Sequence, residues 1–585
     1  MTDVTDSAPH VPARTPAAPS AEALDPRLVR AWAGLAARSV GRERVALDRV
    51  NVFPVADADT GTNLYLTLRE GERAVRAAAP SATGTQLLGA FARGALLGAR
   101  GNSGVILSEW LRGLAVAARR GGGPADLLAQ AARSARAAVA DPAEGTILTA
   151  ADEAAEGARG ARVEGATTGV ADGPAALLAA VRAGADAARE AARASVRTLD
   201  ALSRAGVLDA GACGLVLVLD SLVAVVSAGV SEAGGTMEPV TIGIELDLPR
   251  AGEPGRSGLG APVVVGAVSA PEPWLTSAGH EPLGAGSLEL MFVLTRPGAT
   301  AEGVAEGLRA RLGEVGDSVV VVGGDSGGGD AVWQGHVHTD DLAAALAVAS
   351  AFLADDGTLA QVHVRHLEAA PQHEWGVVVA TAAPALAAEL ALAGAVVLLT
   401  GGFGGAVEPL SAADVHRAAA STGARRALVL PGDARAAAAD AARSATSGDT
   451  ADLDEVVVLD AATDVHAVVA LAALGTLLPV DDTYTADASG VAAEVQEALA
   501  GLRVVVVPGA EAEGELERLL ASLPDAEVVT ALLDDDVPPG LAERLAGVVA
   551  RLAPDAELVA RATGRPGGSV QLGAEDVDGP PDEEE

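Results

Sequence analysis

The chain contains no lysine, so all 41 of its basic residues are arginine. A P-loop needs a lysine on the transferred phosphates, and a Schiff-base enzyme needs one as its nucleophile. Both classes of protein are therefore excluded. Any phosphate chemistry in this chain has to rely on metal ions, backbone dipoles, hydroxyl groups and arginine.

Cysteine is almost absent as well. Cys213 is the single cysteine among 585 residues, which excludes a disulfide framework and fits a reducing cytosol. It stands in a Gly-Ala-Cys-Gly segment, a setting that favours a small packed residue over a nucleophile. Aromatic residues make up only 2% of the chain, and no long apolar groove is evident from the sequence.

Basic residues are few compared with acidic ones, 41 against 79, which gives a net charge of −38. This balance argues against nucleic acid and against anionic membrane surfaces as partners. The first 25 residues lack the apolar segment of a secretory signal, and the longest apolar run, 214–230, is interrupted by Asp220 and Ser221. The sequence predicts a soluble, cytoplasmic protein without membrane insertion.

Against this background, one loop at residues 51–63 concentrates polar side chains. It combines two carboxylates, two hydroxyls, two amides and a glycine, namely Asp57, Asp59, Thr60, Thr62, Asn51, Asn63 and Gly61. Carboxylates one residue apart repel each other unless a positive charge lies between them, and Mg²⁺ prefers such oxygen ligands together with phosphate oxygens. The loop predicts a site for a metal-bound phosphate compound. An Asx-rich turn that caps a helix, with Asp59 or Thr60 as the N-cap, is the alternative.

Two further segments place small and polar residues before an apolar run. In the first, 98–113, glycines allow backbone N–H groups close to a ligand, and Asn102 and Ser103 can donate to phosphate oxygens. In the second, 208–215, a small-residue turn again precedes an apolar run. Tight helix packing explains either segment alone, whereas three such loops in one chain favour a common ligand site.

The chain also divides into regions of different composition and periodicity. Residues 1–25 have the composition of a disordered tail, and 26–230 read as a helical domain broken by glycine-rich loops. Residues 231–262 read as a linker, 263–370 and 371–575 as two α/β domains with alternating β-branched runs and helices, and 576–585 as an acidic tail. The predicted fold class is therefore multidomain, an all-α domain followed by two α/β domains.

These motifs resemble those of the dihydroxyacetone kinase L-type (DhaL-like) domain family, and most closely the ATP-binding subunit of bacterial fatty acid kinase. The segments that carry the resemblance are NVFPVADADTGTNL at 51–64, GARGNSGVILS at 98–108, EGTIL at 144–148 and the turn at 209–214. Ala56 and Ala58 stand where the family pattern has proline and glycine. The resemblance implies a helical barrel whose loops hold two Mg²⁺ ions and ATP.

By that resemblance, Asp57 and Asp59 are catalytic metal ligands, with Asn51 beside them. The implied nucleotide-binding residues are Thr60, Gly61, Thr62, Asn63, Gly101, Asn102, Ser103, Gly104, Asp209, Ala210 and Gly211. In the middle domain His336 and His338 resemble a family pair that binds metal with a cysteine. Glu289 occupies roughly the place of that cysteine, so a second, structural Zn²⁺ site is a hypothesis beside plain hydrogen-bonded histidines.

The function implied is transfer of phosphate from ATP to a fatty-acid carboxylate presented by a DegV-type fatty-acid-binding protein, with the kinase chain as a homodimer. The low aromatic content agrees with a lipid carried by another protein. Two alternatives stay open: a dihydroxyacetone-type kinase for a small hydroxyl substrate, and an inactive nucleotide-binding scaffold. The C-terminal region lacks several of the family's signatures. The prediction of the acyl substrate and the partner is therefore less well supported than the prediction of ATP binding.

Overall fold

The structure is a computed structural model that describes residues 24–161, 174–231, 287–297, 303–324, 330–353, 356–367, 375–403, 406–446, 453–477, 490–523 and 526–575. The predicted linker, apart from residue 231, lies outside these residues. The start of the predicted domain at residue 263 and the acidic tail also lie outside them. The predicted N-terminal tail lies outside them up to residue 23.

The N-terminal part is helical throughout its described residues. Its helices are α1 (Pro26–Arg49), α2 (Thr60–Ala77), α3 (Gly84–Gly98), α4 (Gly101–Arg119), α5 (Pro124–Ala138), α6 (Ile147–Gly160), α7 (Pro174–Thr198), α8 (Asp200–Ala205) and α9 (Ala210–Ser231). Local sequence signals determine where several of these helices begin. At α1, for example, the Asp25 carboxylate accepts a hydrogen bond of 2.8 Å from the Arg27 N–H, and Pro26 is the first helical residue. The predicted all-α region is confirmed, while its closure into a barrel stays a prediction.

Helix α9 is the centre of this part. It packs against α1, α2, α6 and α7, and the Trp32 indole N–H donates to the Val218 carbonyl at 3.0 Å. Residues 210–229 are long and apolar enough to cross a membrane by length and composition, but most of them are buried inside the helical part. Burial against neighbouring helices accounts for the apolar composition.

The remainder of the chain is α/β. Its first sheet contains β1 (Leu288–Arg296), β2 (Asp317–Gly324), β3 (Ala331–Thr339), β4 (Thr358–His366), β5 (Trp375–Thr381), β6 (Val396–Leu399), β7 (Ala406–Val407), β8 (Arg426–Leu430) and β9 (Glu455–Val458). The strand order is β2-β3-β1-β4-β6-β5-β8-β9, with β7 beside β4. The neighbouring strands in β2-β3-β1-β4-β6 pair antiparallel. The neighbouring strands in β6-β5-β8-β9 pair parallel.

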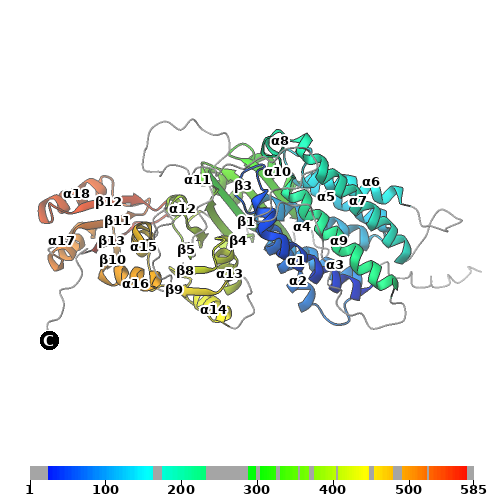
Figure 1. Ribbon diagram of the computed structural model, residues 1–585. Helices are drawn as coiled ribbons and strands as arrows, with labels where there is room; N and C mark the ends of the chain where they lie inside the picture. The colour runs from blue at the N-terminus through cyan, green and yellow to red at the C-terminus, as the bar shows by residue number, and fades with distance from the viewer. Residues whose placement is uncertain are drawn as a thin grey trace, which may run out of the picture.

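The first half of this sheet lies directly against the helical part (Figure 1). Because side chains alternate along a strand, β1 serves two cores. Leu290, Phe292 and Leu294 pack in the α/β core, whereas Met291 packs with the helical domain, as do Val320 and Val322 of β2. The sheet face that carries Met291 is therefore covered by the helical part.

The helices α10 (Val304–Leu312), α11 (Leu342–Ala351), α12 (Pro384–Leu392), α13 (Ala412–Ser421), α14 (Arg435–Thr446), α15 (Asp464–Leu477) and α16 (Val491–Gly501) complete this region. Strands β4 and β6 pair across residue 371, where the sequence predicted a boundary between two domains. The pairing makes one continuous sheet of the two regions. Whether each folds independently stays a prediction.

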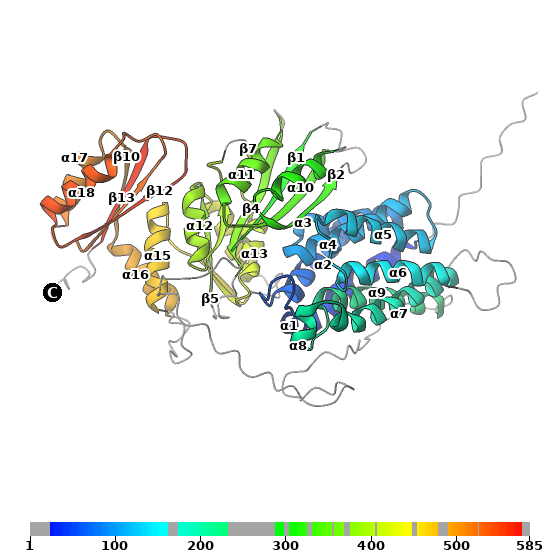
Figure 2. The same cartoon turned by 90° about the horizontal axis from the view of Figure 1, so that it is seen from above.

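The last part of the chain forms a second sheet with strand order β10-β13-β11-β12, seen at the far end from the helical part in Figure 2. Its elements are β10 (Arg503–Pro508), α17 (Ala512–Ser522), β11 (Val528–Leu533), α18 (Leu541–Leu552), β12 (Glu557–Ala562) and β13 (Ser569–Glu575). Buried Asp464 joins the two sheets: it accepts hydrogen bonds from Thr381 at 2.6 Å, Gln571 at 3.0 Å and Arg565 at 3.2 Å.

Candidate functional site

The polar loop at residues 51–63, called the acidic loop from here on, lies between α1 and α2, where the two helices form an antiparallel pair. The Asn51 amide donates to the Asp57 carboxylate at 2.5 Å, and the Thr60 hydroxyl donates to the Asn51 amide oxygen at 2.9 Å. Asn51, Thr60 and Asp57 therefore form one hydrogen-bonded chain. Ala58 has a φ of +52° between the two aspartates. Glycine adopts this left-handed conformation freely, which explains the glycine in the family pattern, whereas alanine holds it at a cost of about 1 kcal/mol.

Asp59 occupies the N-cap position of α2, but its side chain makes no capping hydrogen bond. Its carboxylate instead meets the guanidinium of Arg365 from strand β4. The capping explanation of this loop is therefore incomplete, because the residue at the cap directs its charge away from the helix. The carboxylate serves a polar site between the helical part and the sheet.

Asp48, in the last turn of α1, is a third carboxylate that the sequence analysis missed. It accepts hydrogen bonds from the Thr62 backbone N–H at 2.9 Å and from the Thr62 hydroxyl at 2.8 Å. Burial is the main reason that the pKa of Asp48 rises to about 6, and the nearby charge of Asp59 adds to it. The available signal was an aspartate three residues before Asn51, at the end of a helix that leads into the loop. Thr62, predicted to hold phosphate, is already bonded to this aspartate.

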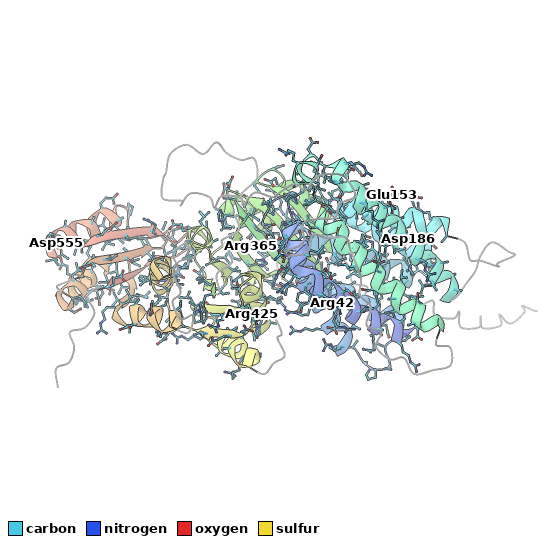
Figure 3. The ribbon with its side chains drawn as sticks, viewed as in Figure 1. Arg42, Glu153, Asp186, Arg365, Arg425 and Asp555 are labelled. Atoms are coloured by element: carbon cyan, nitrogen blue, oxygen red, sulfur yellow. The ribbon has the colours of Figure 1, made fainter. Side chains whose placement is uncertain are left out.

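Arg365 is the second residue that the sequence analysis missed. Its Nε lies 2.7 Å from Glu289 Oε2, and its Nη2 contacts Glu289 at 2.5 Å, Asp59, and Asp57 at 3.7 Å. Glu289 and Arg365 are direct partners in the antiparallel pairing of β1 and β4. Arg365 thus joins the sheet to the acidic loop, and Figure 3 shows it between the two parts.

Burial and charge shift several pKa values around Arg365. Burial first, and then the charge of Asp59, raise the pKa of Asp57 well above its usual range. Burial also opposes ionisation of Glu289, but the guanidinium of Arg365 outweighs it and lowers the pKa of Glu289. A buried arginine between carboxylates stays charged, since its pKa is raised well above the ordinary value by those carboxylates.

The second predicted loop begins α4 beside the start of α2. The hydroxyls of Ser103 and Thr60 are 3.4 Å apart, and a Cβ on Gly104 would lie 2.3 Å from the Thr67 hydroxyl oxygen. The side-chain oxygen of Asn102 is buried without a hydrogen-bond partner. The structure therefore brings the first two loops together and leaves a polar atom of Asn102 available to a ligand.

Gly101 gives the first mutational test. It has a φ of +52°, and a Cβ there would lie 2.3 Å from Asn63 Nδ2. We expect Gly101→Ala to lower the unfolding free energy by about 1 kcal/mol through its backbone and by about 1–3 kcal/mol more through the contact. Because it displaces Asn63, it should also weaken binding of Mg-ATP, the ligand that the sequence predicts here. Chemical denaturation and calorimetric titration measure the two effects.

Gly121 is the matched control, because it has a φ of +73° and nothing within 4 Å of an added Cβ. Gly121→Ala should show the backbone cost alone and unchanged nucleotide affinity. Equal behaviour of the two variants would contradict a role of the Gly101 contact with Asn63.

The third predicted loop starts α9. Asp209 Oδ1 accepts a hydrogen bond from the Ala212 N–H at 2.7 Å, and a Cβ on Gly211 would lie 3.3 Å from that carboxylate oxygen. One turn further, a Cβ on Gly214 would lie 2.2 Å from Leu64 Cδ1, so the start of α9 packs on α2 beside the other loops. Ala210 is buried at this helix start, and Cys213 is a fully buried thiol whose pKa burial raises to about 12. Such a thiol packs and does not act as a nucleophile.

Asp209 predicts a pH dependence of stability. Burial raises its pKa from 3.8 to about 7, against the lowering effect of backbone hydrogen bonds. A carboxyl with a raised folded-state pKa is protonated in the folded chain and ionised in the unfolded chain at intermediate pH. Its contribution to stability is therefore present at low pH and is lost as the pH rises from about 4 to 7.

We expect Asp209→Asn to become more stable than the wild type as the pH is raised from 5 to 8, by up to a few kcal/mol at about 1.4 kcal/mol per pKa unit. Urea denaturation at both pH values measures the difference. Asp555→Asn, at an exposed position, is the control and should show no such trend. A constant difference for Asp209→Asn across this range would show that Asp209 is ionised in the folded protein.

The second predicted metal site, at His336, His338 and Glu289, stays a prediction. The two imidazole rings lie on one face of β3 with centroids 4.9 Å apart, as their spacing predicted. Glu289, however, is committed to Arg365, and its Oε1 is 3.8 Å from His336 Nδ1. Within the part of the chain that the structure describes, no three His, Cys, Asp or Glu side chains are gathered as a metal site. Burial lowers the pKa of His336 to about 3, so that the ring stays neutral.

Comparison with known proteins fits this geometry. Residues 54–224 match the DAK2 domain, and residues 287–374 match the FakA-like middle domain of fatty acid kinase. The chain is 34% identical to the protein YloV of Bacillus subtilis over 211 residues, 35% of this chain and 36% of that protein. It is 38% identical to an uncharacterized protein of Staphylococcus saprophyticus over 123 residues, 20% of this chain and 22% of that protein.

The helical part with its acidic loop therefore matches the DAK2 domain over residues 54–224. With the FakA-like middle domain behind it, the predicted resemblance to the ATP-binding subunit of bacterial fatty acid kinase is confirmed. The matched segments span about a third or less of these curated relatives' own length. A dihydroxyacetone kinase of C. freundii solved with AMP-PNP and Mg²⁺ aligns with a TM-score of 0.27 at 22% identity, over 38% of this chain and 37% of that one.

Proposed function

We propose that this chain is an ATP- and Mg²⁺-dependent kinase that transfers phosphate to a fatty-acid carboxylate held by a DegV-type partner protein. The observation that carries the proposal is the pair of carboxylates Asp57 and Asp59, which lies beside the polar starts of α2 and α4. The DAK2 domain and the FakA-like middle domain support kinase chemistry. The acyl acceptor, the partner and a homodimer come from the family resemblance alone.

The donor set fits divalent cations. Asp57 and Asp59 bring two carboxylates, and the hydroxyls of Thr60 and Ser103 lie at the adjoining helix starts. Burial first, and then the charge of Asp59, raise the pKa of Asp57, and burial is also the main reason for the raised pKa of Asp48. Asp57 and Asp59 are the residues that would hold Mg²⁺, with Asp48 as a further ligand or as the group that orients Thr62.

Held by Asp57 and Asp59, Mg²⁺ would supply positive charge against the negative charge that develops during phosphate transfer. The chain's own residues would fix the geometry. Ser103 and Thr60 place hydroxyls at adjoining helix starts, and the buried Asn102 amide oxygen is free to accept a hydrogen bond from a ligand. Arg365 would hold the aspartates near the sheet through Glu289. Such positioning and charge compensation are the main contributions a protein makes to phosphoryl transfer.

The direct test is calorimetric titration of ATP into the full chain with Mg²⁺ and with EDTA. We expect micromolar binding that requires Mg²⁺. Turnover is then assayed with a fatty-acid-loaded DegV-type protein and, separately, with dihydroxyacetone. Acyl phosphate from the first mixture supports the proposal, and phosphorylation of dihydroxyacetone instead would overturn the acyl acceptor. Binding without any turnover would identify a scaffold, and no binding would overturn the kinase itself.

A further inference from the structure

Arg100 is the N-cap residue of α4 and directly precedes the second predicted loop. It is buried, with only 5% of its surface exposed. Its Nε has no hydrogen-bond partner, and its Nη1 reaches only the carbonyl of the neighbouring Ala99, at 3.5 Å. Among the residues that the structure describes, Arg100 forms no ion pair. A buried guanidinium without a counter-ion is costly, so its presence calls for an explanation.

The carboxylates around Arg100 are committed to other arginines. Burial first, and then the charge of Arg417, lower the pKa of Arg100 to about 9, although three carboxylates act in the opposite direction. Each of these carboxylates pairs elsewhere: Glu70 with Arg73 at 3.0 Å, Glu289 with Arg365 at 2.5 Å, and Asp414 with Arg417. In the described part of the chain, the charge of Arg100 therefore has no counter-charge of its own.

Arg417 approaches the same place from α13, which lies beside the helical part in Figure 2. The Nε of Arg417 is also buried without a hydrogen-bond partner. Gln361 of β4 connects this arginine to the helical part. With its amide nitrogen facing the Leu97 carbonyl, Gln361 donates there at 2.8 Å and accepts from Arg417 Nη2 at 3.0 Å. Leu97 is three residues before Arg100, so both arginines lie at one interface, and each has a buried N–H group without an acceptor.

We propose that Arg100 and Arg417 together bind a phosphate group at the interface between the helical part and the sheet. Phosphate oxygens accept hydrogen bonds from guanidinium groups in pairs, and they would supply the acceptors and the negative charge that both side chains lack. Because the chain has no lysine, arginine has to supply the positive side-chain charge at a phosphate site.

A free phosphate ion and a phosphate group of a nucleotide present this same chemistry. Arg100 directly precedes Gly101, where the predicted nucleotide-binding residues of α4 begin. If the phosphate belongs to a nucleotide, the assignment rests on the proposed function, and it adds Arg417 of α13 to the nucleotide site. If the phosphate is a free ion, the assignment does not depend on kinase activity.

The test is calorimetric titration of the full chain, first with sodium phosphate in a metal-free buffer and then with Mg-ATP. We expect Arg100→Met and Arg417→Met each to weaken binding of the phosphate probe about tenfold or more, since each removes a charge-assisted contact. Arg309→Met is the control. Arg309 also lies between the helical part and the sheet, but it donates to the carbonyls of Ala138 at 3.2 Å and Val321 at 3.3 Å. This control should bind both probes like the wild type.

Urea denaturation in phosphate-free buffer separates binding from a structural role. Arg100→Met should be at least as stable as the wild type, because the substitution removes a buried charge without a counter-ion. A clear loss of stability would assign Arg100 a structural role and overturn the proposal. Arg417→Met, whose arginine side chain is 13% exposed, tests the site through a second residue.

Binding of either probe that is lost in both arginine variants and kept in the control supports the site, and the probe that binds identifies the source of the phosphate. Phosphate binding that depends on the two arginines, without any binding of Mg-ATP, would support the site and contradict the proposed kinase. Mg-ATP binding that is unchanged in both variants, without phosphate binding, would overturn the site and leave the kinase standing. Equal loss in the control, or no binding of either probe by the wild type, would also overturn the site.

Discussion

Replacing Asp57 with asparagine should remove Mg²⁺-dependent turnover while the fold stays at least as stable as the wild type at neutral pH. The lost carboxylate is a proposed metal ligand, so we expect kcat/KM to fall about a thousandfold or more, on the order of 4 kcal/mol. Stability should not fall, because burial and Asp59 raise the pKa of Asp57. The folded chain resists its ionisation, and that cost grows as the pH rises. Asparagine carries no charge and still accepts the hydrogen bond from Asn51.

Turnover, ATP affinity with Mg²⁺, and urea denaturation at pH 7 measure this prediction together. Asp186→Asn is the control: it removes an exposed carboxylate of α7 that pairs with Arg189, far from the loop in sequence. Loss of activity together with a large loss of stability would indicate a structural role for Asp57. Unchanged turnover would remove Asp57 from the proposed metal site.

Arg365→Met should give the largest loss of stability at the contact between the helical part and the sheet. The substitution leaves Glu289, whose side chain is 1% exposed, without its partner. Removing one member of a buried ion pair costs about 3–5 kcal/mol, whereas replacing both members costs much less. The double variant Glu289→Gln/Arg365→Met should therefore recover most of the loss. Chemical denaturation of the two variants measures the difference.

The same double variant tests the link to the acidic loop. Arg365 shares Asp57 and Asp59 with any cation that binds there, so its removal should tighten Mg²⁺ binding, measured without nucleotide, by about tenfold. Arg309→Met is the control, since Arg309 also crosses between the two parts but donates to the Ala138 carbonyl at 3.2 Å. Weaker Mg²⁺ binding in the double variant would show that Arg365 helps to hold the cation and does not compete with it.

Local sequence pattern predicted the elements well. The long apolar periodicity of 26–230 predicted the helical part, and alternating β-branched runs and helices predicted the α/β character of the remainder. These signals are local, because side-chain period and burial are set within one element. The pairing of β4 with β6 is not local. The sequence therefore predicted a domain boundary at residue 371, whereas the strands on its two sides belong to one sheet.

The site divides in the same way. Two compact motifs contain most of the predicted site residues, and the structure places the two motifs side by side. These residues are Asn51, Asp57, Asp59, Thr60, Asn102 and Ser103. Glu289 was correctly singled out but as a ligand in a metal site, and its actual partner is an arginine 76 residues away. A carboxylate on a buried strand face has the same sequence pattern whether a cation or a guanidinium lies opposite.

The sequence by itself excluded phosphate and Schiff-base chemistry that depends on lysine, and it predicted an acidic loop before a helix. It also determined that three loops with similar composition precede apolar helices. Only the tertiary structure decided what meets that loop: Arg365 comes from a strand more than 300 residues away and reaches the aspartates because β1 and β4 pair with Glu289 opposite it. The physical reason is that register and packing between domains, and not local pattern, select which buried charges become neighbours.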